Sequence, residues 1–234
     1  MSLSVFVTGT DTGCGKTRVS CALLEAMSRA GISAGGMKPV ATGATRINGL
    51  LLHDDVKALV AASNVAIPRR YVNPYLYTPA CSPDIAAREA KMPVDLAVIA
   101  EAFRSCQSRA DAVVVEGVGG WFVPLGESIW IEDVARQLQL PVLLVVGVRL
   151  GCINHAVLTA RAIIESGLPL LGWVANVIDP HIYQLGAVIN TISRHLDVPR
   201  LATLDWSPAA TPAALALGLA PCLERLRAPR SHGV

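Results

Sequence analysis

Charged residues are scarce in this 234-residue chain, and they do not gather into a basic face. Asp, Glu, Lys and Arg make up 16% of the sequence, the formal net charge is +2, and the Arg-dense stretch spans residues 224–231. Nucleic-acid binding requires a clustered basic patch or stripe, so this class of function is not indicated. The Arg-dense stretch is interpreted as a solvated, frayed terminus.

Signals for a cysteine metal site, for export and for membrane insertion are missing. The six cysteines, at positions 14, 21, 81, 106, 152 and 222, include no CxxC pair and no neighbouring His at metal-ligand spacing. We therefore expect buried, reduced thiols. The chain shows no basic leader with an Ala-x-Ala cleavage site and no apolar run of eighteen residues. These absences predict a cytoplasmic protein without a membrane partner.

The abundant apolar residues are arranged in short runs. Hydrophobic residues make up 52% of the chain, enough for one sizeable α/β domain. Apolar, β-branched runs without alternation predict strands buried on both faces of a parallel sheet, and they span residues 3–8, 112–115, 142–146 and 170–177. Helical periodicity is found at residues 16–30, 84–89, 96–106, 131–138, 154–166 and 183–196.

The resulting βαβα order predicts one three-layer α/β domain over residues 1–227, with helices flanking a mostly parallel sheet. Residues 228–234 are predicted to be a disordered tail. The polar residues 42–53 are predicted to form a surface loop before a helix capped by Asp54, and residues 71–83 an irregular excursion.

A glycine-rich loop joins the first predicted strand to the first helix. Its sequence, GTDTGCGKT, runs from Gly9 to Thr17. Successive backbone N–H groups of such a loop can point at a phosphate, and the helix N-terminus adds its positive dipole end. Lys16 can then reach the β- and γ-phosphates, and Thr17 can reach a bridging Mg²⁺. The loop predicts nucleoside triphosphate binding on a P-loop NTPase fold, although five residues, rather than the usual four, separate Gly9 from Gly15.

Other chemistry-bearing residues follow predicted strands. Glu116 ends the strand at residues 112–115, and Lys38 follows a short extended stretch, so both should lie at the ligand-binding edge of the sheet. With Asp55, Glu116 can hold the metal, and Lys38 can neutralise charge that builds up in the transition state. A helix cap or loop charge is the alternative for Glu116, and a surface residue is the alternative for Asp55 and Lys38.

The roles of two further polar residues, Asn176 and His155, remain open at this point. Asn176 ends the strand at residues 170–177, from which its amide could pair with a purine edge, but an ordinary loop asparagine fits equally well. His155 lies at a predicted helix start, and a structural or capping role is favoured because no Ser or Cys nucleophile pattern accompanies it.

Taken together, these motifs resemble the dethiobiotin synthetase family, whose lengthened loop reads GTDTxxGKT. The matching segments cover residues 8–17, 38–43, 73–75, 116–122, 151–155 and 172–176, in the family's order and spacing. The resemblance extends from Val5 to about Trp206. It implies a homodimeric, Mg²⁺-dependent cyclo-ligase that uses ATP and CO₂ to close 7,8-diaminononanoate into dethiobiotin, within biotin biosynthesis.

The resemblance also implies roles for individual residues. Lys16, Lys38 and Thr12 would be catalytic, and Thr17, Asp55 and Glu116 would hold the metal. Thr42 would contact the diamine or carbamate, and the partner subunit would bind the distant substrate carboxylate through Gly151, Cys152, Ile153 and Asn154. Nucleotide contacts are expected from Gly13, Cys14, Gly15, Lys16, Thr17, Arg18, Asp55, Glu116, Gly117, Val118, Gly119, Asn176, Asp205, Trp206 and Ser207.

Some positions depart from the family pattern. Thr42 replaces a common serine but keeps the hydroxyl, and Gly13 replaces an acidic residue of some members. Val177 and Pro212 stand where acidic residues can occur near the base, so the choice among ATP, CTP and GTP stays open.

Two rival functions are a paralogous cyclo-ligase or amide-forming ATPase with another acceptor, and a partitioning-type switch ATPase. The switch ATPases carry a signature lysine six positions before the loop threonine, where this chain has Asp11.

Overall fold

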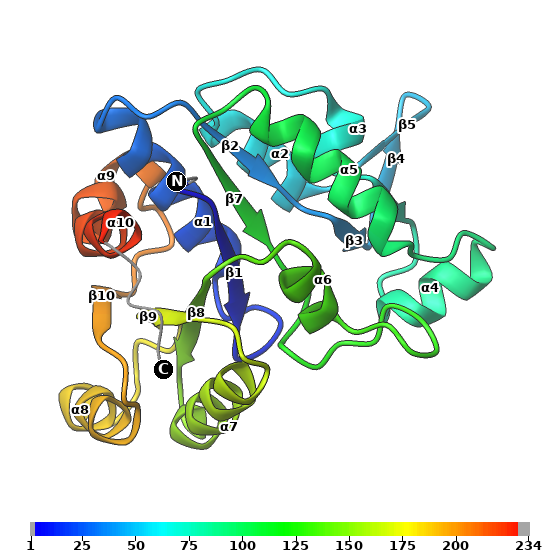
Figure 1. Cartoon of the computed structure of the whole chain (residues 1–234). Helices are drawn as coiled ribbons and strands as arrows, with labels where there is room; N and C mark the ends of the chain where they lie inside the picture. The colour runs from blue at the N-terminus through cyan, green and yellow to red at the C-terminus, as the bar shows by residue number, and fades with distance from the viewer. Residues whose placement is uncertain (1–2, 229–234) are drawn as a thin grey trace.

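Within residues 3–228, which the computed structural model describes, a sheet of six parallel strands forms the centre of the molecule (Figure 1). The strand order is β10-β9-β8-β1-β7-β2, and every neighbouring pair is parallel. The strands are β1 Val5–Gly9, β2 Ala34–Met37, β7 Ala112–Glu116, β8 Val142–Val148, β9 Leu170–Val177 and β10 Arg200–Leu204. The predicted parallel α/β fold is therefore confirmed.

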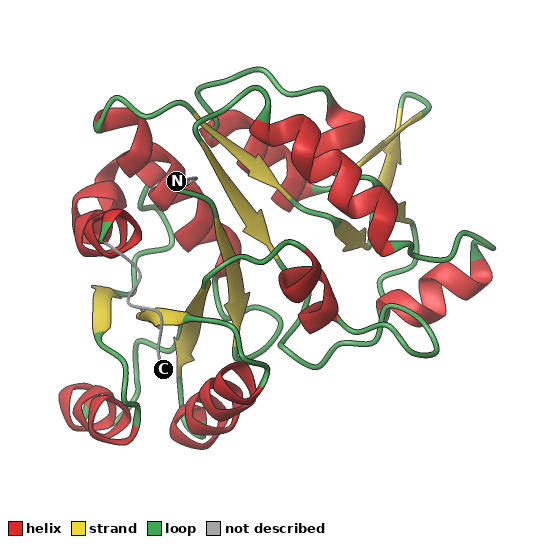
Figure 2. Cartoon of the chain, viewed as in Figure 1, coloured by secondary structure: helices red, strands yellow, loops and turns green. Residues whose placement is uncertain are grey.

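Helices cover both faces of this sheet, as Figure 2 shows. The longer ones are α1 Lys16–Arg29, α2 Asp54–Ala62, α5 Leu96–Gln107, α7 Cys152–Glu165 and α8 Leu185–His195. The shorter ones are α3 Arg69–Val72, α4 Pro83–Glu89, α6 Ile131–Gln137, α9 Pro212–Leu215, the 3₁₀ helix η1 Ala216–Leu219 and α10 Ala220–Arg227.

Successive residues of each central strand enter different cores, which explains the unbroken apolar runs. Val5 and Val7 pack with α1, η1 and α10 on one face, whereas Phe6 packs with α5, α6 and α7 on the other. A strand that is covered on both faces has no solvent side and needs no polar residue. Burial on both sides therefore fixes the sheet and aligns the carboxyl ends of its strands.

Several elements were not predicted from the sequence. Residues 42–53 were expected to be a loop, but they contain an antiparallel hairpin of β4 Thr45–Ile47 and β5 Leu50–Leu52. Residues 71–83 were expected to be irregular, but β6 Tyr75–Tyr77 pairs with β3 Val40–Thr42 in a small parallel sheet. The β4 strand is exposed throughout, so it lacks the alternation that reveals a half-buried strand.

The C-terminal region corrects a second expectation. Residues 224–227 of the Arg-dense stretch belong to α10, and Cys222, Leu223 and Leu226 of that helix are buried against the α1 core. The interpretation of this part as a frayed end was therefore wrong, because arginines on one helix face do not prevent burial of the other. Residues 229–234, including the rest of that stretch and most of the predicted tail at 228–234, lie outside the described residues, and the domain limit at residue 227 stays a prediction.

The cysteines agree with expectation apart from one position. All six lie within the described residues and are free, and five of them are buried, whereas Cys81 is half-buried beside the main cavity. Burial raises the pKa of the Cys21, Cys106 and Cys222 thiols to about 12, which keeps them protonated and unreactive. Among residues 3–228 no helix is both long and apolar enough to cross a membrane.

Candidate active site

The phosphate loop takes its shape from two glycines with left-handed backbone. Gly13 has φ 75° and Gly15 has φ 95°, a region that residues with a Cβ seldom adopt. Gly15 is also crowded, since a Cβ added there would lie 2.1 Å from Asn176 Nδ2, whereas one added at Gly13 would meet nothing within 4 Å. Gly15 caps α1, so the loop ends where the helix presents its free N–H groups.

Lys16 extends from the first turn of α1 back along this loop. Its Nζ donates to the backbone oxygens of Asp11, at 2.9 Å, and Gly119, at 2.5 Å. Burial is the main cause that lowers the pKa of Lys16, and the nearby Lys38 charge adds to the effect. The ammonium therefore lies between the loop and the segment after β7, held by carbonyls that a phosphate can replace.

Lys38 is the centre of a buried ionic cluster. Its Nζ donates to Glu116 Oε1 at 2.6 Å, to Asp55 Oδ2 at 2.9 Å and to the Gly117 carbonyl oxygen at 3.1 Å. The Thr17 hydroxyl donates to the same Glu116 oxygen at 2.8 Å. The side chains of Lys38 and Glu116 are 3% and 0% exposed. The surface-residue alternative for Lys38 is excluded by this burial.

The cluster shifts the pKa values of two of its members in opposite directions. Burial alone would lower the pKa of Lys38, but the Glu116 and Asp55 carboxylates outweigh it and raise that pKa above its ordinary value. Burial would raise the pKa of Asp55, but Lys38 and a hydrogen bond from Thr17 lower it below its ordinary value. Lys38 is therefore a permanent cation at neutral pH, and Asp55 is a permanent anion.

One oxygen of the cluster has no partner. Glu116 Oε2 is fully buried and accepts no hydrogen bond within the described residues, a costly state for a carboxylate oxygen. Residues 3–228 contain no group of three or more His, Cys, Asp and Glu side chains able to hold a metal alone. Mg²⁺ in nucleotide sites commonly takes only one or two carboxylates and completes its shell with phosphate and water. The orphaned oxygen beside Thr17 and Asp55 therefore fits that cation.

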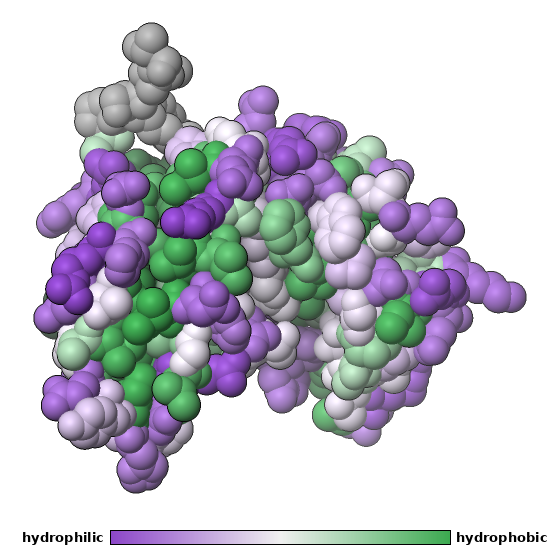
Figure 3. All heavy atoms as spheres, turned by 90° about the horizontal axis from the view of Figure 1, so that it is seen from below, coloured by the Kyte–Doolittle hydropathy of each residue, from purple (hydrophilic) through white to green (hydrophobic). Residues whose placement is uncertain are grey.

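These groups line a cavity of about 700 Å³ at the carboxyl edge of the sheet. Figure 3 views the molecule from below, toward this edge, and shows the surface hollowed near its middle. The predicted site residues that line the cavity are Thr12, Gly13, Gly15, Lys16, Thr17, Lys38, Thr42, Asp55, Glu116, Val118 and Gly119. A cavity with two lysines, two carboxylates and a P-loop is suited to phosphoryl transfer.

A second cavity, of about 310 Å³, continues from the loop toward β9 and β10. Arg18, Asn176, Trp206 and Ser207 line it, together with Gly13 and Gly15. Asp205 is adjacent, and its backbone oxygen accepts a hydrogen bond from Arg18. The expected nucleotide contacts are thus divided between two cavities that share Gly13 and Gly15.

The predicted residues outside both cavities have structural contacts. The Cys14 side chain is buried, and its carbonyl accepts from Asn176. The Gly117 carbonyl accepts from Lys38. Cys152 is buried at the start of α7, whereas Gly151 and Asn154 are exposed. None of the residues from Gly151 to Asn154 is among the described residues that line the main cavity. The contacts of the described residues do not test the structural or capping role predicted for His155.

His53 is a site residue that the sequence reasoning missed. Asp54 was expected to cap α2, but His53 is the cap, and its Nδ1 accepts from the Asp55 backbone N–H at 3.2 Å. The His53 Nε2 therefore carries the hydrogen that it shares with the Thr42 carbonyl, at 3.0 Å. Asp54 instead points into solvent. Helix boundaries shift by one or two residues with the local backbone conformation, so the preference of Asp for N-cap positions did not identify the capping residue. The polar residues ahead of the helix were the only sequence feature that marked its start.

Comparison with solved structures shows the same fold at low sequence identity. The septum site-determining protein MinD from Pyrococcus horikoshii, solved with Mg-ADP, matches at a TM-score of 0.56 and 14% identity, covering 96% of each chain. A ParA family ATPase from Chlorobium tepidum matches at a TM-score of 0.57 and 12% identity, over 95% of this chain and 96% of that one. These likenesses show that the chain shares the α/β fold of these proteins.

Sequence comparison is more specific. An AAA domain family model matches residues 4–214. The ATP-dependent dethiobiotin synthetase BioD of Aromatoleum aromaticum is 48% identical over 214 residues, which is 92% of this chain and 95% of that protein. BioD 1 of Salmonella typhi is 42% identical over 228 residues, 96% of this chain and 100% of that protein. At this identity, over nearly the whole chain, the protein belongs to the ATP-dependent dethiobiotin synthetase family.

Proposed function

We propose that this protein closes 7,8-diaminononanoate with CO₂ into the cyclic urea dethiobiotin, converting ATP into ADP and phosphate, as a step of biotin biosynthesis. The observation that supports this most strongly is the convergence of Lys16, Lys38, Thr17, Asp55 and Glu116 on one cavity. Membership of the dethiobiotin synthetase family supplies the substrate class.

The chemistry has three steps, each of which places negative charge near the lysines. One amine attacks CO₂ and loses a proton, giving a carbamate. A carbamate oxygen attacks the γ-phosphorus and ADP leaves, giving a carbamic-phosphoric anhydride. The second amine then attacks the carbonyl carbon and loses a proton, phosphate departs with the bond to the carbonyl carbon broken, and the urea ring closes. Ring closure is intramolecular, so positioning of the diamine supplies much of the acceleration.

Lys16 and Lys38 neutralise this charge from fixed positions. Lys16 exchanges the Asp11 and Gly119 carbonyls for β- and γ-phosphate oxygens, and the loop N–H groups complete the cradle. Lys38, held by Glu116 and Asp55, keeps its proton and faces the carbamate and the transferred phosphoryl group. A charge that is already oriented before reaction favours the transition state without reorganisation. Thr12 and Thr42, which also line the cavity, would position the carbamate and the diamine.

We place Mg²⁺ at Thr17, Asp55 and Glu116, where Glu116 Oε2 lacks a partner. These residues would hold the cation, which would supply positive charge to offset that of the triphosphate. Asp55 has a lowered pKa, so it stays ionised and available as a ligand throughout the neutral range.

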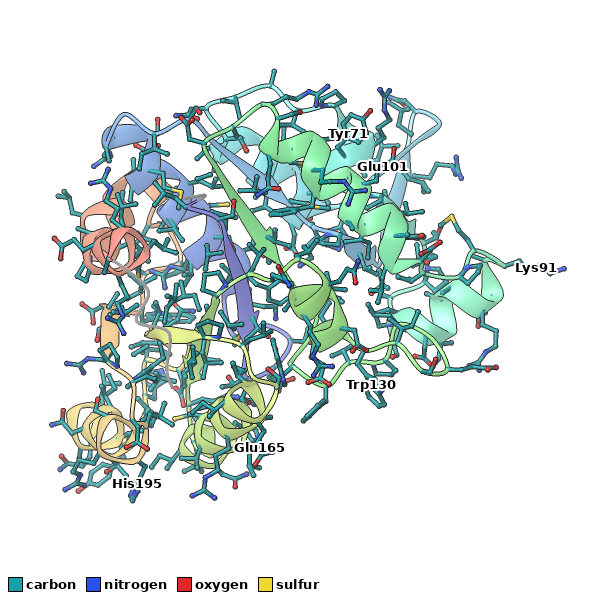
Figure 4. The ribbon with its side chains drawn as sticks, viewed as in Figure 1. Tyr71, Lys91, Glu101, Trp130, Glu165 and His195 are labelled. Atoms are coloured by element: carbon teal, nitrogen blue, oxygen red, sulfur yellow. The ribbon has the colours of Figure 1, made fainter. Side chains whose placement is uncertain are left out.

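The active form is proposed to be a homodimer, with the start of α7 of one subunit completing the site of the other. Gly151 and Asn154 are exposed at the carboxyl edge of the sheet yet do not reach their own main cavity, and helix N-termini bind carboxylates well. Leu150, which directly precedes the start of α7, is 92% exposed, and this supports a contact there. A second exposed apolar group is the edge-to-face pair Phe122 and Trp130; Trp130 lies beside α6 (Figure 4).

The rival functions differ in what their ATP turnover requires. A switch ATPase of the same fold would hydrolyse ATP without a diamine. In this chain the position of its signature lysine holds Asp11, which pairs with Arg149 at 2.8 Å. A paralogous cyclo-ligase would need a different acceptor. Phosphate release measured with Mg-ATP, bicarbonate and diamine, each omitted in turn, separates the three: dethiobiotin synthesis requires all of them.

A further inference from the structure

The chain passes from one sheet to another at Lys38 and Pro39. β2 ends at Met37, which pairs with Val115 of β7, and β3, which begins at Val40, pairs with β6 in the small parallel sheet (Figure 1). Pro39 has no N–H to donate. The N–H and carbonyl groups of Lys38 lie between the two sheets and outside both ladders, so they need partners from elsewhere in the chain.

These partners come from the segment that follows α3. The Lys38 N–H donates to the Val72 carbonyl oxygen at 2.8 Å. The Lys38 carbonyl oxygen accepts from Asn73 Nδ2 at 2.6 Å, and the same Nδ2 donates to the Tyr75 carbonyl oxygen at 3.0 Å. The Tyr75 N–H donates to the Pro39 carbonyl oxygen at 3.1 Å. The backbone of Lys38 is thus held at both its N–H and its carbonyl.

The Asn73 side chain is fixed in one orientation. It is 7% exposed, and its Nδ2 faces two carbonyl oxygens, which can only accept, so a flipped amide would lose both hydrogen bonds. Pro74 follows, and a residue before proline is kept out of the α region; the Asn73 backbone has φ −144° and ψ 84°, outside that region. The local sequence therefore presets the direction of this amide.

The two donated hydrogen bonds are the contribution of an asparagine at this position. Asn73 Oδ1 is buried and accepts no hydrogen bond within the described residues, a cost that an apolar side chain would avoid. Asn73 is not one of the described residues that line either cavity. Its effect on the reaction therefore has to pass through a neighbour, and the neighbour in the main cavity is Lys38.

We infer that Asn73 is a positioning residue, which sets the backbone of Lys38 so that its ammonium reaches Glu116 and Asp55 and faces the group being transferred. The inference deepens the proposed function, since it assumes the catalytic role of Lys38. The ammonium lies at the end of a flexible four-carbon stem, yet its contacts with the two carboxylates are 2.6 Å and 2.9 Å long. Such contacts require a fixed backbone, because a misplacement of about 1 Å at a reacting group can lower turnover about a hundredfold.

A double-mutant cycle on kcat tests the inference. Asn73→Ala removes both donors and should lower kcat about ten- to hundredfold, while the dissociation constant for Mg-ATP changes by less than about threefold. In the Lys38→Gln background the same substitution should lower kcat by less than about threefold, because the group that Asn73 positions is gone. Equal fold losses of kcat in the two backgrounds would mean that Asn73 does not act through Lys38, and would overturn the inference.

Asn64→Ala is the matched control, because Asn64 holds the opposite end of the same strand. Its Oδ1 accepts from the Ala34 N–H at 2.7 Å, and its Nδ2 donates to the Ile32 carbonyl oxygen at 2.9 Å. This variant should lose thermal stability but keep kcat within about threefold of wild type. A loss of kcat as large as that of Asn73→Ala would overturn the inference. If Asn73→Ala does not fold, Asn73→Asp, which fills the same space with at most one donor hydrogen, replaces it in both backgrounds under the same criterion.

The proposed function and the inference fail in different measurements. Absence of diamine-dependent product from wild-type protein would contradict the proposed function. The rate at which acetic anhydride modifies Lys38, measured from peptide masses, tests the geometry without turnover, because Lys38 is only 3% exposed. Asn73→Ala should raise that rate at least about threefold above the rate in Asn64→Ala, since a loosened backbone exposes the amine more often. Equal rates in the two variants would overturn only the inference.

Discussion

Replacement of Lys38 by glutamine removes the cation from the most buried ionic cluster of the site. Glu116 and Asp55 are then left as two carboxylates with one positive charge fewer, and Glu116 is completely buried. Removal of one partner of a buried pair typically costs 3–5 kcal/mol. Asp55 is partly exposed, and glutamine can still donate a hydrogen bond, so we expect about 3 kcal/mol. In a chain of this size that corresponds to a fall in Tm of about 6–12 °C.

The Lys38→Gln substitution should also lower kcat strongly. Lys38 faces the group being transferred, and the loss of one fixed contact to transition-state charge costs about two to three decades in kcat. The Asp11 and Gly119 contacts that hold Lys16 are unaffected, so the dissociation constant for nucleotide should change by less than threefold. The expected result is a folded protein that binds ATP and turns over slowly.

The assay is single-turnover phosphate release with diamine and bicarbonate, beside thermal unfolding and nucleotide titration on the same samples. The matched control is the double variant Lys38→Gln with Glu116→Gln, which restores the net charge of the cluster. It should regain at least half of the lost stability yet stay inactive. Wild-type turnover in Lys38→Gln would refute the catalytic role of Lys38.

The pH dependence of the free energy of unfolding tests the ion pair between Lys38 and Asp55 independently. Lys38 and Thr17 lower the pKa of Asp55 below its ordinary value of 3.8, so the stabilising contribution of Asp55 is fully present above that value. It is lost as the pH falls through the lower pKa of the folded state. In Lys38→Gln the main charge that lowers this pKa is absent, so the difference in stability between wild type and variant should shrink below about pH 4. If the difference in free energy of unfolding between wild type and Lys38→Gln stayed constant down to pH 2, the proposed ion pair between Lys38 and Asp55 would be contradicted.

Three further predictions concern the loop, the metal and the C-terminal helix. Thr17→Val should raise the Mg²⁺ concentration for half-maximal turnover at least tenfold, while Thr17→Ser, which keeps the hydroxyl, should change it less than threefold; equal effects would argue against a metal ligand. Gly15→Ala should abolish measurable ATP binding by calorimetry, because its Cβ meets Asn176, whereas Gly13→Ala has open space and bears only the φ strain; the reverse order would contradict the loop geometry. Leu223→Ala in α10 should lower the free energy of unfolding by 2–4 kcal/mol in urea titration, and a change below 0.5 kcal/mol would mean that this helix does not pack.

The central sheet and the loop were predictable because their signals are local. A short apolar run rich in β-branched residues favours a buried strand, and GKT at the end of such a strand favours a phosphate loop. Glu116 and Lys38 were placed correctly because parallel strands align their carboxyl ends. In contrast, β10 and the hairpin of β4 and β5 have short, partly exposed strands, and their partners are chosen by tertiary packing.

Contacts between distant residues could not be predicted. Lys38 was assigned to the phosphate, but its ion pairs with Asp55 and Glu116 depend on the packing of three elements. For Asn176 the residues left a purine contact and an ordinary loop role open, and its hydrogen bonds to the Cys14 carbonyl and Arg18 were not foreseen. The two Asn176 contacts join residues more than one hundred and fifty positions apart, and neither propensity nor periodicity specifies any of these pairs.

The measurement that most directly tests the proposed function is the identification by mass of the product formed from diamine, bicarbonate and Mg-ATP. Dethiobiotin is expected, with one ADP and one phosphate released for each ring closed, and with no product when the diamine or bicarbonate is left out. ATP hydrolysis at the same rate without the diamine, and no mass corresponding to the cyclic urea, would contradict it.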